Sequence, residues 1–389
     1  MRSVTEADIK DKRVIVRVDW NVIFDKRGEI EDDFRIRQTL PTIKFLQERG
    51  ARSIILLSHL GRPSAEDKGN SEFSLRPLAT YLSNLLGIKV YFFTEDISSH
   101  LSKKIKQLDR GSIVLLENIR FYPGELRNDD VFAKELALLG DIYVNEAFSV
   151  SHRKQASLCA ITKYLSSYGG LLLEKEVQRL RQFLHNLCPP VVIIMGGAKT
   201  KDKLPLIKNF LLQADYILGG GILANTILKS WGFEIGNSLW DKEVLEEAKS
   251  LGSRRAELVL PGDFLVLTKT GKVQKRGLGE IKKTDTILDI GPIAADSFVK
   301  IINKARTIFW NGPMGKFEDE RFSQGTQKIS KAILKNNKAY SVIGGGETLA
   351  SIKDKDKFLG QDNIFLSTGG GATLKFLAGE KLPALECLK

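Results

Sequence analysis

Arginine side chains recur at the ends of apolar runs in the first half of the sequence. Arg35, Arg62, Arg120 and Arg153 lie at such ends or just beyond them. Arginine presents a fixed fork of donors that suits carboxylate and phosphate oxygens, although a single arginine is more often a solvated surface residue. Four of them predict a crevice for an anionic substrate, because the same runs also end in polar residues: His59, His152, Asp19 and Asn21.

Glycine runs end the apolar segments of the second half. They stand at 195–199 (MGGAK), 219–221 (GGG), 311–313 (NGP), 344–348 (GGGET) and 369–371 (GGG). Glycine lets a phosphate approach the backbone, and a helix that follows presents free N–H groups and a positive dipole end to an anion. One run alone indicates only a tight turn. Five at corresponding positions predict a phosphate or nucleotide site.

The kind of nucleotide site is a separate question. The segment 219–224 (GGGILA) matches the loose dinucleotide pattern G-x-G-x-x-A, which would suit a nicotinamide dehydrogenase. The ribose-binding acid should close a second strand about 20 residues later, but 237–249 (NSLWDKEVLEEAK) has a helical pattern. A dehydrogenase is therefore disfavoured. The Walker pattern G-x-x-x-x-G-K-[ST] is also absent, so an ATP enzyme would need another scaffold.

The elements that must position these residues alternate between two patterns. Stretches such as 35–50 and 75–87 carry apolar residues at helical spacing and end in glycine, which stops a helix. Between such stretches lie short β-branched runs, and this β–α alternation predicts mainly parallel sheets with the crevice at the carboxyl ends of their strands. The expected strands are 13–19, 53–60, 88–93, 112–119 and 142–148 in the first half, and 191–197, 216–221, 258–267, 307–313, 340–346 and 363–371 in the second.

The length of 389 residues suits two domains rather than one core. Between the two series of strands, Leu173, Val177, Leu180 and Leu184 fall on one helical face, and Pro189 with Pro190 stops that helix. We expect this helix to connect the domains. The composition, 42% hydrophobic and 27% charged, is typical of a globular protein and not of a disordered one.

Charge and cysteine content exclude some classes of protein. The net charge of +12 is spread along the chain among 47 acids, which favours a solvated basic surface attractive to small polyanions over a nucleic-acid site. Cys159, Cys188 and Cys387 occur singly, so neither a disulfide framework nor a zinc site is supported. The chain has no apolar run long enough for a membrane span, and its first residues lack a signal-peptide segment. We expect a cytoplasmic protein.

Ten segments in order resemble the motifs of the phosphoglycerate kinase family and together cover almost the whole chain. They are RVDWNV, DDFRIRQTLPTI, SHLGRP, LLENIRFYPGE, GGAKTKDKLPLI, GGGILANTIL, LDIGP, FWNGPMGKFE, GGGET and STGGGATLKFL. The resemblance implies reversible phosphoryl transfer between 1,3-bisphosphoglycerate with ADP and 3-phosphoglycerate with ATP, in glycolysis and gluconeogenesis. It also implies Mg²⁺ bound with the nucleotide, a monomer, and no nucleic-acid or membrane partner.

The family fold implied by the resemblance is α/β, with two doubly wound, mainly parallel-sheet Rossmann-like domains joined by a hinge helix. We expect a phosphoglycerate-binding domain at 1–170, completed by the tail from about 372 to 389. The linker helix would take 171–188 and the nucleotide-binding domain 189–371. Domain closure would bring the two substrates together.

The resemblance also assigns residues to the two substrates. Arg35 is expected to reach the transferring phosphoryl group, and the other residues on phosphoglycerate are Asp19, Trp20, Asn21, His59, Leu60, Gly61, Arg62, Arg120 and Arg153. Catalysis is expected to use Arg35, Lys199, Gly370 and Gly371, with Gly369 at the same helix N-terminus. The nucleotide site is expected to contain Lys199, Lys203, Gly219, Asn311, Glu318 on the ribose, Gly345, Gly346, Glu347 and Thr348.

The sequence departs from the family pattern at a few positions. Glu347 stands where the family usually has Asp, so the carboxylate expected at the metal lies one methylene further out. Glu146, Ser149 and Val150 replace the more usual acid and small residues before Arg153, and Ile23 stands where proline is common. Two rival hypotheses remain: a catalytically retired homologue that binds nucleotide or a partner protein, and a nucleic-acid-binding protein.

Overall fold

The computed structural model describes residues 1–252 and 256–389, and the chain folds into two compact units. The first unit comprises Met1–Gln178 with Lys381–Lys389, and the second comprises Arg179–Glu380. The tail that returns to the first unit is therefore shorter than the expected 372–389. Within the described ranges, no helix combines the length and apolar character needed to cross a bilayer.

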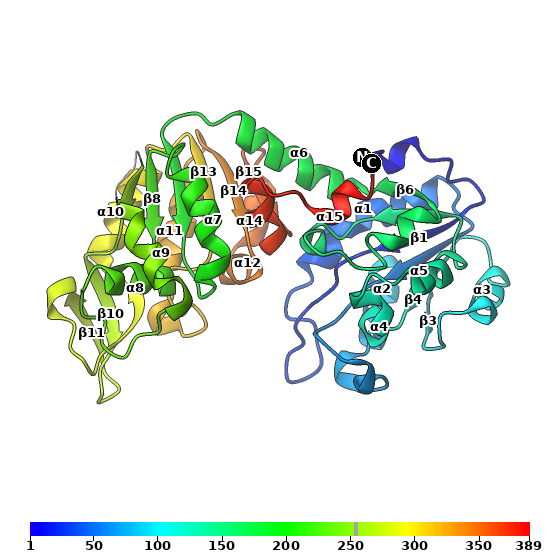
Figure 1. Ribbon diagram of the computed structural model, residues 1–389, viewed down its shortest axis with the longest axis horizontal. Coiled ribbons are helices and arrows are strands. Elements are labelled where there is room, and N and C mark those ends of the chain that lie inside the picture. The colour runs from blue at the N-terminus through cyan, green and yellow to red at the C-terminus, as the bar shows by residue number, and fades with distance from the viewer. Residues whose placement is uncertain (253–255) are drawn as a thin grey trace. The chain divides into compact units, whose positions relative to one another are not determined.

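The first unit is built on a parallel sheet of six strands in the order β3-β4-β2-β1-β5-β6 (Figure 1). Its central strands are almost fully buried, because helices cover a parallel sheet on both faces. The strands are β1 (Arg13–Arg17), β2 (Ser53–Leu57), β3 (Val90–Phe93), β4 (Ser112–Leu116), β5 (Ile142–Asn145) and β6 (Ser166–Gly169). The helices are α1 (Phe34–Glu48), α2 (Arg76–Leu86), α3 (Ser99–Lys106), α4 (Pro123–Leu126), α5 (Asp130–Ala137) and α15 (Pro383–Glu386).

The second unit contains another six-stranded parallel sheet, in the order β15-β14-β13-β7-β8-β9. Its strands are β7 (Val191–Met195), β8 (Tyr216–Gly219), β9 (Glu257–Val259), β13 (Thr307–Asn311), β14 (Tyr340–Gly344) and β15 (Ile364–Ser367). Its helices are α7 (Thr200–Phe210), α8 (Gly221–Ser230), α9 (Leu245–Lys249), α10 (Pro292–Ile302), α11 (Gln324–Lys335), α12 (Gly346–Ser351), α13 (Lys355–Leu359) and α14 (Gly371–Leu377). The expectation of two doubly wound, mainly parallel domains is confirmed.

A three-stranded antiparallel sheet in the second unit was not expected. It pairs β10 (Asp263–Leu267) with β11 (Val273–Gly277) and β12 (Thr286–Ile290), around a small core that includes Phe264 and Val266. The single strand predicted at 258–267 is wrong. Pro261 cannot donate to a strand ladder, and the chain there leaves the parallel sheet after β9 and enters the antiparallel sheet with β10.

Helix α6 (Leu171–His185) links the two units, and it begins in the first and ends in the second. Leu173, Val177 and Leu180 are buried as their spacing predicts. Phe183 takes the last buried position, whereas Leu184 is only half-buried.

The first turn of α6 is held by a buried carboxylate. Glu146 accepts hydrogen bonds from the Leu172 and Leu173 amides, both at 3.0 Å, and from the Thr42 hydroxyl. These amides have no partner inside the helix, so Glu146 replaces a capping side chain. Burial nevertheless raises the pKa of Glu146 to about 7, against the lowering effect of these hydrogen bonds.

We expect the stability of the protein to depend on pH through Glu146. The folded state binds this proton more tightly than the unfolded chain, whose glutamate pKa is 4.5. Stability from this group is therefore greatest at low pH and is lost as pH rises through 7. The difference in unfolding free energy between wild type and Glu146→Gln should fall by about 2 to 3 kcal/mol from pH 5 to 8.

Urea unfolding of both proteins across this pH range measures the effect. Glu48→Gln, which changes an exposed carboxylate at the end of α1, is the matched control. A difference between wild type and Glu146→Gln that does not change with pH would contradict the raised pKa.

Candidate functional site

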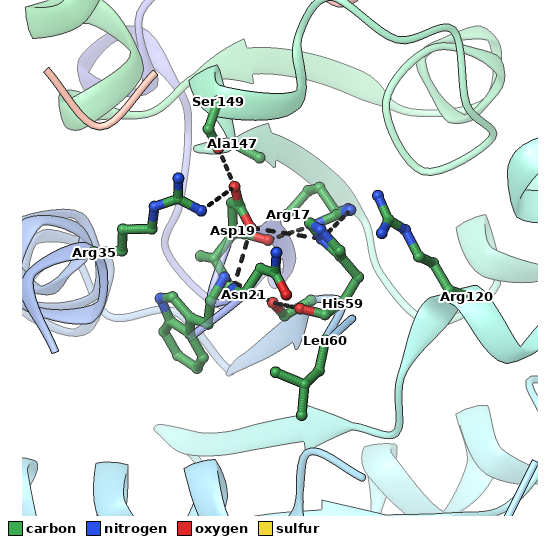
Figure 2. A network of polar contacts seen from close by, with 12 residues as sticks. Arg17, Asp19, Asn21, Arg35, His59, Leu60, Arg120, Ala147 and Ser149 are labelled. Carbon is green, nitrogen blue, oxygen red and sulfur yellow. Dashed lines mark hydrogen bonds and ion pairs between the residues drawn. The ribbon is translucent and has the colours of Figure 1, made fainter. Parts of the chain in front are cut away.

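The polar residues of the first unit gather where its strands end. Asp19 follows β1, His59 follows β2, Arg120 follows β4, and Ser149 with Arg153 follows β5. These strands are parallel neighbours, so their carboxyl ends meet at one edge of the sheet, where open α/β sheets bind ligands. Figure 2 shows several of these side chains pointing toward one another.

Asp19 is the acidic centre of this group. Arg35 Nη1 donates to Asp19 Oδ2 at 3.0 Å, and the Ser149 hydroxyl donates to the same oxygen (Figure 2). Burial alone would raise the pKa of Asp19, but the charges of Arg35 and Arg17 and the hydrogen bond from Ser149 hold it well below its usual value. Asp19 is thus a carboxylate at any physiological pH, and it fixes the guanidinium of Arg35.

His59 is neutral. Burial lowers its pKa well below the usual value, and the neighbouring Arg17 and Arg120 lower it further, although Asp19 opposes them. Arg17 Nη2 lies 3.3 Å from His59 Nδ1. Since arginine can only donate, Nδ1 accepts and the proton is on Nε2. The 3.6 Å approach of His59 to Asp19 is therefore not an ion pair.

Arg17, Arg62, Arg120 and Arg153 form a cluster whose positive charges are only partly balanced by nearby carboxylates. Burial lowers the pKa of Arg120 to about 10, and repulsion from Arg153 and Arg17 adds to it. Burial and Arg62 lower the pKa of Arg153 in the same direction. Among the described residues, Arg120 Nε and Nη2 are buried without a hydrogen-bond partner. Buried donors of this kind are costly unless paired, so the cluster is suited to bind an anion.

The loop after β2 is held in place by the side-chain amides of Asn21 and Asn118 and by the backbone conformation of Gly61. Asn21 Oδ1 accepts from the Gly61 amide at 2.8 Å, and Asn118 Nδ2 donates to the Leu60 carbonyl at 2.8 Å. Gly61 has φ of +63°, and a Cβ there would lie 2.7 Å from the Phe73 ring. The carbonyl of Gly61 accepts from Arg120 Nη1. The loop is thus rigidly placed beside the arginine cluster.

Two predicted site residues do not present their side chains to this crevice. Trp20 is fully buried and donates from Nε1 to the Thr39 hydroxyl at 3.1 Å. The Leu60 side chain belongs to the same hydrophobic core. Both are placed by apolar burial, so any contact with substrate must come from their backbone groups.

The sequence analysis did not identify the residues whose hydrogen bonds support the arginine cluster and Asp19. Arg17 is fully buried, and its Nε donates to the Ser157 hydroxyl at 2.8 Å, which in turn donates to Glu125 at 2.7 Å. A charged residue inside an otherwise apolar strand was the available signal. Ser149, noted only as a departure from the family pattern, proved to be the hydrogen-bond donor to Asp19.

The glycines of the second unit lie where backbones cross closely. A Cβ on Gly221 would lie 2.7 Å from the Gly197 amide nitrogen, and one on Gly312 would lie 2.2 Å from the Gly196 carbonyl oxygen. Gly197, Gly221 and Gly312 also have positive φ. Only glycine is compatible with such packing, so these runs bring the ends of β7, β8 and β13 together.

A pocket of about 440 Å³ opens beside these glycines, within the second unit. Its walls are mostly apolar and include Leu239, Phe264, Leu288 and Phe317, and the predicted Glu318 lies at it. Glu347 is also part of its lining. Apolar walls with a few polar groups are typical of small-ligand sites, and the dimensions suit a nucleoside.

Two lysines and a carboxylate lie beside Gly197. Lys203 Nζ and Glu347 Oε2 would lie 3.3 and 3.2 Å from a Cβ on that residue. Lys203 is buried, and burial lowers its pKa to about 8 against the opposing effect of Glu347. Lys199 is exposed at the N-cap of α7. A phosphate near Lys203 would restore its full charge, as electrostatic pairing raises an amine pKa.

Asn311 and Thr348 position loops rather than point at the pocket. Asn311 Nδ2 donates to the Gly344 carbonyl at 2.7 Å. The Thr348 hydroxyl accepts from the Gly312 amide at 2.7 Å and donates to the Gly344 carbonyl at 2.8 Å. Gly345 has φ of +104°, and a Cβ there would clash with Asn311. Gly346 then begins α12, with Glu347 in its first turn.

The remaining predicted glycines also lie at strand ends. Gly219 ends β8, packed against Leu260. Gly370 has φ of +51° and precedes α14, which begins at Gly371, while the Gly369 amide donates to the Ser367 hydroxyl at 3.1 Å. Space for a Cβ at Gly370 is open, so its glycine requirement comes from the backbone conformation.

The donor set of the second unit fits a metal that arrives with the nucleotide. Within the described residues, no group of three or more His, Cys, Asp or Glu side chains could hold a metal ion by itself. Mg²⁺ is commonly bound by one or two carboxylates together with substrate phosphates and water. Glu347, an exposed carboxylate at the pocket, provides a ligand of this kind.

Comparison with known proteins gives one consistent result. The sequence model described as phosphoglycerate kinase matches residues 4–380. Curated proteins named phosphoglycerate kinase are similar to this chain: that of Thermosipho africanus is 45% identical, covering 99% of this chain and 97% of its relative. That of Coprothermobacter proteolyticus is 40% identical, covering 100% and 98%.

Solved structures that are similar to this chain are also phosphoglycerate kinases. The phosphoglycerate kinase of Pyrococcus horikoshii OT3 has a TM-score of 0.87 at 33% identity, with 100% of this chain and 98% of that one covered. The phosphoglycerate kinase of Coxiella burnetii has a TM-score of 0.81 at 39% identity, with 99% and 98% covered.

Proposed function

The chain belongs to the phosphoglycerate kinase family, and we propose how its own residues carry out that family's reaction. It is a phosphotransferase of glycolysis with a carboxyl group as acceptor, and its substrates are 3-phosphoglycerate, 1,3-bisphosphoglycerate, ATP and ADP. The observation that supports the placement of substrates best is the arginine cluster of the first unit, whose buried Arg120 donors lack partners among the described residues.

We place phosphoglycerate at the arginine cluster. Arg62, Arg120 and Arg153 would bind its phosphate and carboxylate, because guanidinium forks match both groups. Asn21 and the backbone of the His59–Arg62 loop would line the same crevice, and Asp19 would orient Arg35 toward the reacting carboxylate. His59, being neutral, would contribute a hydrogen bond rather than a charge.

We place the nucleotide at the pocket of the second unit. The apolar walls would hold the base and Glu318 would bind the ribose hydroxyls. Lys199 and Lys203 would contact the phosphates, supported by backbone amides at Gly219, Gly345, Gly346 and Gly369–Gly371. Asn311 and Thr348 would act by holding these loops in place.

The chemistry needs charge compensation more than proton transfer. The attacking carboxylate of 3-phosphoglycerate is already ionised at neutral pH, so no general base is required. Arg35, Lys199 and the amides at Gly370 and Gly371 would share the negative charge of the moving phosphoryl group. Substrates bound to separate units would meet only on domain closure, which would exclude water and suppress hydrolysis of ATP.

Glu347 would help to hold Mg²⁺ that arrives with the nucleotide, and the ion would supply neutralisation of phosphate charge when bound. Because Glu is longer than the usual Asp and Mg²⁺ tolerates little error in its octahedral geometry, we propose that Glu347 acts mainly through a water ligand. Its carboxylate would also balance the charge of Lys203, whose Nζ approaches Gly197 from the same side.

Replacement of Glu347 by Gln should raise the Mg²⁺ concentration needed for half-maximal rate at least about 3-fold, as expected for an outer ligand contact. Affinity for 3-phosphoglycerate should stay nearly unchanged, and Glu347→Asp should be tolerated or slightly better. Steady-state rates over a Mg²⁺ titration measure this. Glu320→Gln, an exposed acid of the same unit, is the control. An unchanged Mg²⁺ dependence would remove Glu347 from the metal site.

The activity itself is tested by supplying 3-phosphoglycerate and MgATP, and following NADH oxidation by a coupled dehydrogenase that consumes 1,3-bisphosphoglycerate. Turnover is the expected result. Nucleotide binding without turnover would favour a catalytically retired homologue, and steeply salt-dependent binding to DNA or RNA would favour a nucleic-acid role.

We also propose that the protein acts as a monomer in the cytoplasm, where glycolysis takes place.

A further inference from the structure

The two cysteines of the first unit lie against each other although they are 228 positions apart in the sequence of 389 residues. Cys159 is buried at the end of the segment that follows β5, and Cys387 follows α15 in the tail. Cys159 belongs to a small hydrophobic cluster with Ala147, Val150 and Ala384, and the partly buried Cys387 packs against this cluster. The two cysteines therefore lie near each other, and the Cys387 thiol contributes to the raised pKa of Cys159.

The tail packs on the first unit through this cluster and through further apolar residues. Leu382, Ala384 and Leu388 are buried, and the Ala384 amide donates to the Ser151 carbonyl at 3.1 Å. The tail is only nine residues long in this unit, Lys381–Lys389, and it follows directly on the second unit.

We propose that Cys159 and Cys387 form a reversible disulfide that fastens the C-terminal tail to the first unit. The oxidant is a small disulfide such as oxidised glutathione. This inference does not depend on the proposed substrate placement. Cys188, the third cysteine, is exposed and belongs to the second unit, which leaves it outside the pair.

The order of the two thiol–disulfide exchange steps follows from the different exposure of the two cysteines. Cys387 is partly exposed whereas Cys159 is buried, and burial and the Cys387 thiol both raise the pKa of Cys159. The Cys387 thiolate would therefore attack one sulfur of oxidised glutathione and release one glutathione thiolate. Cys159 would lose its proton and attack the Cys387 sulfur, which releases the second glutathione. Two thiols are oxidised to one disulfide, and one oxidised glutathione is reduced to two thiols.

The disulfide would act on a segment that also carries site residues. Ser149, which donates to Asp19, and Arg153 lie between Ala147 and Cys159. Val150 packs in the same cluster as Ala384 of the tail. A covalent bond from the tail to Cys159 would therefore restrain the end of the segment that supports this edge of the sheet, as cross-links do by limiting the alternatives open to the chain.

The test is oxidation of the full-length protein in glutathione buffers of increasing oxidised fraction, followed by peptide mapping under non-reducing conditions. The wild type and Cys188→Ser, the matched control, should both yield a Cys159–Cys387 peptide with loss of two thiols, and dithiothreitol should reverse it. The variant Cys387→Ser should yield no such peptide. Because Cys387 is only partly buried, this variant should still fold. Oxidation should also raise the melting temperature of Cys188→Ser by at least about 3 °C and leave that of Cys387→Ser unchanged.

Two outcomes would overturn the proposal. One is a glutathione adduct on Cys387 that persists while Cys159 keeps its free thiol at every buffer composition. The other is a disulfide that joins two chains or involves Cys188 in the wild type. A Cys159–Cys387 disulfide that leaves the melting temperature of Cys188→Ser unchanged would overturn the fastening role.

Discussion

Alanine at Arg35 or at Lys199 should lower the turnover number of phosphoryl transfer by at least about 100-fold, the scale expected when one preorganised charge contact to the transition state is lost. The two residues belong to different units of the chain, yet in our proposal they stabilise the same moving phosphoryl group. Each substitution should therefore reduce turnover more than it weakens the binding of either substrate, since the contact is strongest in the transition state. Steady-state kinetics in the coupled assay give both quantities.

Neighbouring cations provide matched controls for this pair. Arg37→Ala changes an exposed arginine of α1 that pairs with Asp33, and Lys201→Ala changes an exposed lysine of α7 that pairs with Glu243. Both should keep nearly normal turnover. Arg35→Ala also removes the partner of the buried Asp19, so its melting temperature must be compared with that of wild type. A folded Arg35 or Lys199 variant with near-normal turnover would remove that residue from the mechanism.

Local sequence patterns were sufficient for most strands of the two parallel sheets, because parallel strands buried on both faces are continuous apolar runs. They did not predict β6 (SSYG), which has no such run. β2 (SIILL) and β7 (VVIIM) are buried at every position and were recognisable from their letters alone. The antiparallel sheet was not recognisable in this way. β11 (VQKRG) is polar and mostly exposed, so its pairing with β10 depends on partners and not on its own pattern.

The residues of the candidate site were likewise predictable only in part from the sequence. The arginines and glycines could be proposed from residue type and position, because strand ends in a parallel sheet share one edge. The hydrogen-bond partners of these residues could not be predicted in this way. Arg17 meets Ser157 across 140 positions of sequence, and such a contact is fixed only by the tertiary fold. Trp20, which the family resemblance assigned to phosphoglycerate, has its side chain buried in the core, so a contact with substrate would have to come from its backbone.

The arginine cluster leads to the second large effect, on binding rather than turnover. Arg120→Ala should weaken 3-phosphoglycerate binding by about 10- to 150-fold, because a charge-assisted contact contributes roughly 1.5 to 3 kcal/mol. Arg120 Nε and Nη2 are buried donors that have no partner among the described residues, so a bound anion can supply the hydrogen bonds that they lack. MgATP affinity should change less than about 2-fold, because Arg120 belongs to the first unit and the nucleotide pocket to the second.

Isothermal titration calorimetry with each substrate separately measures both affinities. Arg127→Ala, an exposed arginine at the end of α4, is the matched control and should leave both unchanged. Arg120→Met retains most of the packing but loses the guanidinium, including its hydrogen bond to the Gly61 carbonyl, so comparison with Arg120→Ala separates loss of these polar contacts from loss of packing. If Arg120→Met bound phosphoglycerate normally and MgATP poorly, the two substrates would have to exchange units, and the four arginines would need another explanation.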